Sequence, residues 1–463
     1  MIRAFVSRLL GISIPFFGRP VLPIVECERS GHRRAASSKL PETRAVSTGR
    51  RGWKYFTGAE RRYSDAEMTV KSPGVPKSAY YVALDGLRAI AVIMVFFQHY
   101  GAGHAFLFGW GWTGVDLFFV LSGFLITGIL YDSQHKIHRY RDFYIRRTLR
   151  IFPLYYFVWI VVLLIAPVAH WQWNIRWALW PAYFGNYARF FFLHQPGDPY
   201  RFDKLTFGAP TSSWFGYPFH LYIGHFWSLC VEEQFYLIWP FVVYQVPKRE
   251  TLIKICIAVS VLCPILRGVL SIGLSPQLLG MELFYRSLPT RIDALLIGGL
   301  IALCLRGPEE NIVRRARRPL LVASSILFVA LYLICVKILS LPFEGSASNW
   351  IGVFGFTLID AVAAALILEC IHPGSFLSEI LSWKPLRALG VISYGFYVYH
   401  DLLHDFYSDL AHRLSPRYAY PFTLLIAFTG TLLIATLSYR LLENPLLRLK
   451  ERFASQVHTA PPA

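Results

Sequence analysis

From Ala83 onward, the chain is a succession of apolar segments, each near the length that a helix needs to cross a bilayer. A hydrocarbon core offers backbone polar groups no water, so such segments must form helices or closed barrels, and segments of about 20 residues favour helices. We predict about ten crossings, at 83–104, 109–130, 151–169, 225–246, 251–273, 290–306, 319–341, 350–371, 386–407 and 421–442. The sequence therefore predicts an all-α fold, a polytopic membrane helix bundle.

The composition agrees with a membrane protein. Hydrophobic residues make up 55% of the 463 positions and charged residues only 16%, whereas a soluble domain has about 25% charged residues. The net charge is +18, but the basic residues form short clusters between apolar spans, which favours a topological role over nucleic-acid binding. The seven cysteines are scattered without a CxxC pair, so we expect neither a disulfide framework nor a metal site.

The basic clusters predict the direction of the helices. They lie just before residue 150 and at 247–254, 306–318, 383–387 and 446–452. A further apolar stretch, 177–192, could be read as another crossing, but the clusters all fall on one side of the membrane only if it does not cross. Its Pro181, Gly185, Asn186 and Arg189 favour a re-entrant or interfacial segment. Because basic loops stay in the cytosol, we predict both termini there, with the bundle in the cell (inner) membrane.

The first 78 residues differ from the rest. They are Arg-rich and contain no long apolar run. Their opening resembles a transit peptide in composition, but we favour either a disordered basic extension or a true start near Met68. The domains we predict are this extension, a membrane domain at 79–450, and a short cytosolic tail at 451–463.

Ionisable side chains recur within the predicted spans, where they are costly. With the helix directions above, one set reaches a similar depth in the outer half of five spans: His99, Asp116, Glu232, Arg291 with Asp293, and His400. Each has a simpler explanation alone, such as a packed histidine or a structural Arg291–Asp293 pair. Their convergence instead indicates a functional site. Polar residues of the same spans accompany the set, namely Ser122, Ser228 and Tyr397.

A second signal lies on the predicted cytosolic side. Arg147 and Arg150 are three residues apart and share a helical face. Arg88 shares a face with His99, three turns or about 16 Å away along the first span. Guanidinium groups suit bidentate phosphate contacts. An ordinary basic flank of a membrane span explains most such runs, so this signal is weak by itself.

Several stretches together resemble acyltransferase family 3, the ten-helix membrane acyltransferases that modify bacterial surface sugars and some small molecules. They occur in family order: LDGLRAIAV leading to His99, GVDLFFVLSGFLIT, YIRRTLRIFPLYY, FWSLCVEEQFYLIWP, RIDALLIGG, ISYGFYVYHDLL and LLENPL. Cys230 stands where a small serine is common. We expect no extracytoplasmic domain after the last span, and the resemblance then implies a stand-alone acyltransferase. Residues 1–78 match nothing in the family.

The resemblance implies both substrates. The donor would be an acyl-CoA, most often acetyl-CoA, acting as a co-substrate, and no bound cofactor is expected. The acceptor would be a hydroxyl of a carbohydrate or glycolipid. Arg88, Arg147 and Arg150 would hold the phosphates of CoA at the cytosolic side of the membrane.

His99 would act as general base on the acceptor hydroxyl, although covalent transfer through His99 stays open. Glu232 would orient its imidazole, with Asp116 as the rival partner. Hydrogen bonds to the thioester or acceptor would come from Ser122, Ser228 and Tyr397, and Arg291, Asp293 and His400 would support the site. The alternatives are a multi-pass transporter or exporter, against which we see no internal repeat, and an inactive relative acting as a scaffold.

Overall fold

A computed structural model of the protein describes residues 81–101, 110–165, 167, 175–188, 204–207, 219–273, 281–338 and 350–449. These residues belong to one compact unit, 72–463. The predictions for 1–78 and for the tail at 451–463 fall outside the described residues.

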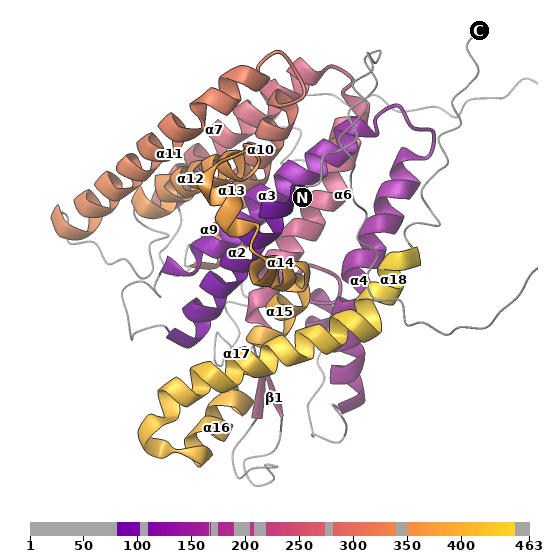
Figure 1. The fold of residues 1–463 in the computed structure, drawn as a ribbon, viewed down its shortest axis with the longest axis vertical. Helices are drawn as coiled ribbons and strands as arrows, with labels where there is room; N and C mark the ends of the chain where they lie inside the picture. The colour runs from indigo at the N-terminus through magenta and orange to yellow at the C-terminus, as the bar shows by residue number, and fades with distance from the viewer. Residues whose placement is uncertain are drawn as a thin grey trace, which may run out of the picture. The chain divides into compact units, whose positions relative to one another are not determined.

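The described residues are almost entirely helical (Figure 1). The helices are α2 (Val82–Gly101), α3 (Thr113–Asp132), α4 (Arg139–Ile165), α6 (Trp227–Gln245), α7 (Arg249–Gly273), α9 (Met281–Arg286), α10 (Leu288–Cys304), α11 (Glu310–Tyr332), α12 (Phe356–Cys370), α13 (Phe376–Leu381), α14 (Lys384–Val391), α15 (Ser393–His400), α16 (His404–Leu414), α17 (Ala419–Ser438) and α18 (Asn444–Leu449). Two short strands, β1 (Lys204–Phe207) and β2 (Phe219–Tyr222), pair antiparallel, with Lys204 opposite Tyr222. The predicted all-α membrane bundle is confirmed, with this small hairpin as an addition.

Each predicted crossing coincides with one or more helices. Seven of the described helical segments are long and apolar enough to span a membrane, those built around α3, α4, α7, α10, α11, α12 and α17. The other three predicted crossings are α2 and α6, which carry charged side chains, and the ninth. The ninth was expected as one helix over 386–407, but it is broken into α14, α15 and the start of α16.

The closest helix pair in the centre of the bundle is α3 with α10. Gly123 of α3 lies against the backbone of Leu295, and Gly298 of α10 lies against the carbonyl of Val120. A Cβ atom at either glycine would meet the backbone of the partner helix. Small residues permit such close approach between membrane helices, where dispersion rather than water exclusion drives packing.

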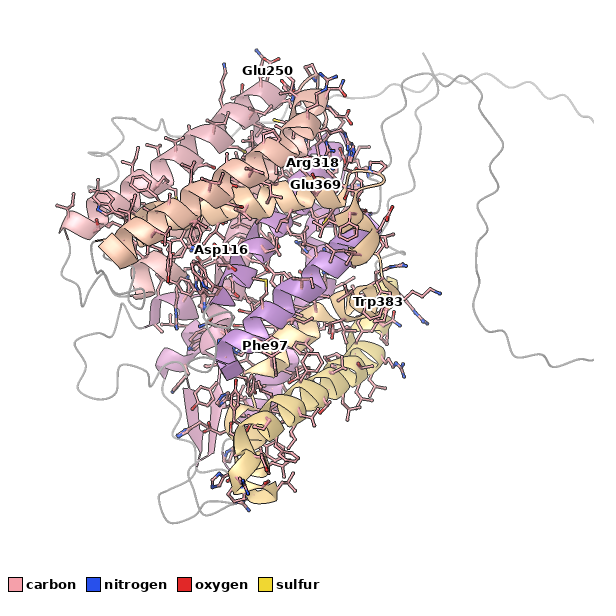
Figure 2. The ribbon with its side chains drawn as sticks, turned by 60° about the vertical axis from the view of Figure 1, so that its left-hand side comes forward. Phe97, Asp116, Glu250, Arg318, Glu369 and Trp383 are labelled. Atoms are coloured by element: carbon pink, nitrogen blue, oxygen red, sulfur yellow. The ribbon has the colours of Figure 1, made fainter. Side chains whose placement is uncertain are left out.

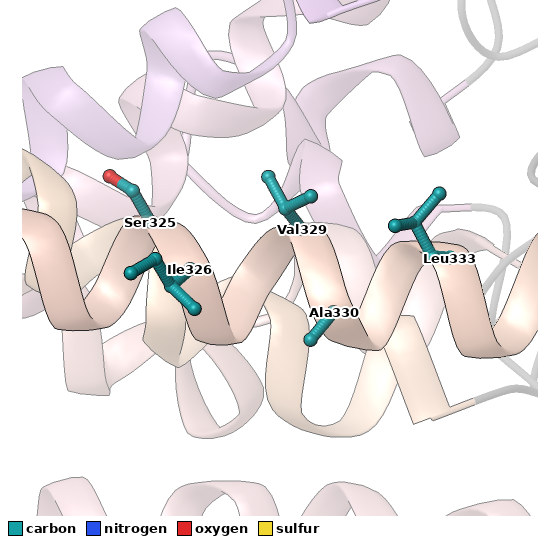
Figure 3. Close-up of a pocket in the computed structure, with 5 residues that line it drawn as sticks. All are labelled: Ser325, Ile326, Val329, Ala330 and Leu333. Carbon is teal, nitrogen blue, oxygen red and sulfur yellow. The ribbon is translucent and has the colours of Figure 1, made fainter.

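Burial separates inner from outer helices. The apolar stretches of α3 and α10 are 72% and 78% buried, whereas those of α7 and α11 are only 17% and 11% buried. Figure 1 shows α7 and α11 along one flank of the bundle. The outer face of α11 carries a shallow apolar pocket of about 420 Å³, lined by residues of that helix from Ser325 to Leu333 (Figure 3). We assign these apolar faces to contact with lipid.

The ambiguous stretch does not form a crossing helix where it is described. Residues 175–188 make two short 3₁₀ turns joined by a bend. Their carbonyl groups are held by side chains from long helices: Tyr155 donates to Trp180 at 2.5 Å, Tyr156 to Pro181 at 3.0 Å, and Gln234 to Tyr183 at 2.8 Å. Irregular backbone is tolerated at membrane depth only when protein satisfies it in this way.

Ion pairs tie several helix ends together. Arg306 donates to both oxygens of Asp132 at 2.7 and 2.8 Å, which joins the ends of α10 and α3. Arg249 at the start of α7 donates two hydrogen bonds to Glu309, and these bonds hold the pKa of Glu309 below its ordinary value. Figure 2 shows Glu250, Arg318 and Glu369 toward this same end of the bundle. The Arg249–Glu309 pair therefore brings the two basic clusters at 247–254 and 306–318 to the same end of the bundle.

Candidate active site

Three separate segments bring histidines together. His99 lies in the last turn of α2, His225 in a 3₁₀ turn at Gly224–Phe226 just before α6, and His400 at the end of α15. The Nδ1 atom of His99 is 2.8 Å from Nε2 of His400. The ring centroids of His225 and His400 are 4.9 Å apart. The break in the ninth span is what places His400 and Asp401 at a helix end facing the other two segments.

The hydrogen bonds decide which nitrogen of His99 is basic. Nδ1 of His400 lies 2.6 Å from the carbonyl oxygen of Tyr397, which can only accept, so this nitrogen carries a proton. Nε2 of a neutral His400 is then an acceptor, and Nδ1 of His99 must donate to it. Nε2 of His99 is left with its lone pair available. The side chain of His99 is 32% exposed.

Asp401 supplies the negative charge beside this pair. Its Oδ2 atom lies 4.0 Å from Nε2 of His99 and 3.6 Å from Nδ1 of His225. The other nitrogen of His225 is 3.1 Å from the carbonyl oxygen of Val398 and therefore donates to it. A carboxylate at this distance stabilises an imidazolium at His99. Among the described residues, no group of three or more potential ligands is arranged to hold a metal ion.

A column of polar side chains continues from the histidines into the bundle. The hydroxyls of Ser228 and Tyr397 are 2.5 Å apart, and Tyr397 also donates to the carbonyl of His225 at 2.6 Å. One turn further along α6, about 6 Å deeper, Glu232 accepts a hydrogen bond from Ser122 of α3. The structure therefore brings Ser122 and Ser228, predicted as supporting residues, into one column with Glu232 and Tyr397.

The column ends at the predicted arginine cluster. The guanidinium of Arg147 lies 4.2 Å from the ring centre of Tyr236, which is on α6 one turn beyond Glu232. Arg147 and Arg150 both interact electrostatically with Glu232. Arg150 also interacts electrostatically with Arg88 of α2, whose guanidinium donates to Asp85 at 2.7 Å. The arginines predicted to bind the donor thus come from two helices, α2 and α4, and their donor role stays a prediction.

Glu232 and Asp116 do not lie where the expected pairing with His99 requires. No hydrogen bond or ion pair joins either carboxylate to His99 within the described part of the chain. Asp116 accepts a hydrogen bond from Arg291 instead. Asp293 is bonded to Arg267, at 2.9 Å, rather than to Arg291. The set expected at one depth is therefore divided between the histidine end, the middle of the column, and a separate buried ionic cluster.

Four residues of these clusters were absent from the sequence-based site. Asp401 directly follows His400, and His225 is three residues before Ser228, so both were near predicted residues but lacked a distinctive motif. Arg267 and Asp360 carried a clearer signal, because each is a charged residue in the middle of a predicted apolar crossing.

The fold and this site define a membrane-embedded helix bundle with an acid–base site at one end and arginines at the other. The sequence profile of acyltransferase family 3, described as an acyltransferase domain, matches residues 81–440. The chain belongs to this family.

Curated relatives cover much of the same region. A Bacillus subtilis (strain 168) protein, YrhL, whose provisional name is peptidoglycan O-acetyltransferase, is 33% identical over 69% of this chain and 48% of its own length. The peptidoglycan O-acetyltransferase OatA of Listeria monocytogenes is 31% identical over 69% of this chain and 49% of its own. The O-acetyltransferase OatA of Staphylococcus aureus is 27% identical over 79% and 57%. The chain spans about half the length of these relatives. No solved structure matches it.

Proposed function

We propose that this protein is a membrane O-acetyltransferase that moves an acetyl group from acetyl-CoA to a hydroxyl of a carbohydrate acceptor, with a cell-envelope polysaccharide as the acceptor class. The observation that carries the proposal is the hydrogen-bond chain from Tyr397 through His400, which leaves Nε2 of a partly exposed His99 as a base. Family membership supports acyl transfer, and the relatives' names support a glycan acceptor.

In the proposed reaction, Nε2 of His99 takes the proton of the acceptor hydroxyl as its oxygen attacks the thioester carbonyl. The new C–O bond forms and the C–S bond breaks, and the proton passes from His99 to the departing CoA thiolate. Asp401, 4.0 Å from Nε2, stabilises the imidazolium formed in between. His400 holds the imidazole in the reactive tautomer. This assigns to His400 and Asp401 the partnership first expected for Glu232 or Asp116.

We propose that the donor lies along the polar column. We assign the CoA phosphates to Arg88, Arg147 and Arg150 at one end, with the thioester at the histidine end. Glu232 balances the charge of Arg147 and Arg150 and orders Ser122 along the way. We propose that the donor binds from the cytosol and the acceptor from the far side, and that the protein lies in the inner membrane with both termini cytosolic.

The activity is tested with membranes that contain the full-length protein and labelled acetyl-CoA. We expect label in an alkali-labile ester on a glycan acceptor, and none with membranes that lack the protein. Uptake of a solute or of the label without ester formation would contradict the proposal and favour the transporter.

The donor role of the arginines predicts the effect of Arg150→Gln. We expect the KM for acetyl-CoA to rise about tenfold, the loss of one charged hydrogen bond to phosphate, while kcat changes less. Arg141→Gln is the matched control, since Arg141 is on the same helix with its side chain 57% exposed. An unchanged donor KM in Arg150→Gln would remove this residue from the donor site.

A further inference from the structure

A second buried ionic cluster lies beside the polar column and is not used by the proposed mechanism of acyl transfer. It joins α3, α7, α10 and α12, and Figure 2 shows its member Asp116 inside the bundle. Its five charged side chains are each at most 1% exposed: Asp116, Arg267, Arg291, Asp293 and Asp360. Charges so deeply buried must be balanced by partners or by protons, because the interior does not solvate them.

One half of the cluster is fully bonded. Arg267 donates to both oxygens of Asp293, at 3.2 and 2.9 Å. Its other donors reach the carbonyl groups of Thr290 and Val353 and the hydroxyl of Thr357. Thr357 donates to Asp293 at 2.6 Å. This pair is a neutral unit that needs nothing further.

The other half of the cluster is not fully hydrogen-bonded. Arg291 donates one hydrogen bond to Oδ1 of Asp116. Oδ2 of Asp116 and both oxygens of Asp360 are buried and have no hydrogen-bond partner among the described residues, and neither have Nε and Nη1 of Arg291. The two carboxyl groups nevertheless lie within hydrogen-bonding reach of each other. Ionised carboxylates only accept, so a hydrogen bond between them requires a proton on one of them.

The charge count gives the same answer. Two arginines and three ionised aspartates would leave one uncompensated negative charge in the centre of the bundle. A single proton brings the cluster to neutrality and supplies a donor between the two carboxyl groups, which as carboxylates could only accept. We propose that Asp116 and Asp360 form a proton-binding site that holds one shared proton while the protein is in its folded state.

The remaining neighbours are consistent with this count. In the part of the chain that the structure describes, neutral side chains contact the five charged groups. Cys263 and Thr357 donate to Asp293, and the ring centres of Phe356 and Tyr285 lie 4.0 and 5.4 Å from the guanidinium of Arg291. The proton therefore replaces a missing cation and joins α3 to α12, in addition to the Arg291 link from α3 to α10.

Infrared spectroscopy of the purified full-length protein at neutral pH tests the site directly. We expect a protonated-carboxyl band in the wild type that is lost in Asp360→Asn and also in Asp116→Asn. The band is lost in the second variant because Asp360 then ionises and pairs with Arg291. If the wild-type band survives Asp360→Asn, or if that variant does not fold, the proposal is overturned, since an amide reproduces the shape and donor of a protonated carboxyl.

A double-mutant cycle in thermal stability gives an independent test. Each single variant keeps the cluster neutral, so we expect each to lower Tm by at most a few degrees. The double variant leaves one arginine unbalanced, and we expect a loss well beyond the sum. Asp360→Asn combined with Asp409→Asn, a change on exposed α16, is the additive control.

The outcome of this cycle is separate from the acyl-transfer assay. Additive effects in the Asp116–Asp360 cycle would overturn the shared proton. So would a Tm that rises with Na⁺ or K⁺ in the wild type but not in Asp360→Asn, because a bound cation would then occupy the place of the proton. Either result leaves the proposed O-acetyltransferase function untouched, and loss of that function would leave the proton site standing.

Discussion

His99→Gln abolishes acetyl transfer while the protein still folds. Glutamine can donate the hydrogen bond that His400 Nε2 receives from His99, but it has no basic nitrogen for the acceptor proton. General-base catalysis contributes about 10² to 10⁴ in rate, so we expect kcat to fall by about that factor with little change in Tm. His99→Ala should be as inactive and somewhat less stable. The measurement is initial rate of acetyl ester formation with membranes of equal protein content.

His412→Ala is the matched control for this experiment. His412 is exposed on α16, so we expect full activity from that variant.

Asp401→Asn tests the carboxylate beside the histidines, because it keeps the shape of the side chain but removes the charge beside Nε2 of His99. We expect its rate to lie between those of the wild type and His99→Gln. Normal turnover in His99→Gln would remove His99 from the reaction.

Gly298→Ala destabilises the bundle, although alanine is the better helix former. The added Cβ would meet the carbonyl of Val120 in α3, so the two central helices must separate. Forcing one extra carbon into a closely packed contact costs about 1–3 kcal/mol. We expect a clear fall in the Tm of the purified protein. We expect activity to fall with it, because α3 also carries Ser122 of the polar column.

Gly268→Ala is the control for Gly298→Ala, and we expect it to leave the Tm unchanged or to raise it. Gly268 is in α7, and a Cβ there would have Val353 at an ordinary 3.7 Å. Alanine in place of glycine within a helix is favourable by about 1 kcal/mol, so Tm should hold or rise. Equal shifts in the two variants would show that helix propensity, rather than the contact between α3 and α10, controls stability here.

The positions of the arginines and of His99 within their own helices were largely predictable from the sequence. Arg88 and His99 share a helix, and helical geometry fixes their separation. Arg147 and Arg150 are equally fixed on α4. For residues of one helix, the spacing along the sequence is enough to predict their relative positions. The broken 175–188 segment was also recognisable, because its proline, glycine and asparagine do not suit a helix in lipid.

The carboxylates were harder to place. Asp116, Glu232 and Asp293 were correctly expected inside the bundle, yet each has a partner that the sequence did not suggest. Asp401 gained its place only because the ninth span breaks at His400. A pairing between helices depends on the rotation of each helix about its axis, and one residue changes direction by about 100° along a helix.

By itself, the sequence determined that this protein is an all-α membrane bundle, that it carries its ionisable groups inward, and which motifs it shares with its family. These features follow from each segment by itself, because an apolar segment of bilayer length forms a helix in the membrane and its charged side chains must turn away from lipid. Only the tertiary structure decided that Asp401 and His400 serve His99 while Asp116 joins Arg291 and Asp360. Those partnerships arise from the close α3–α10 contact and the break after α15, which depend on how separate helices meet.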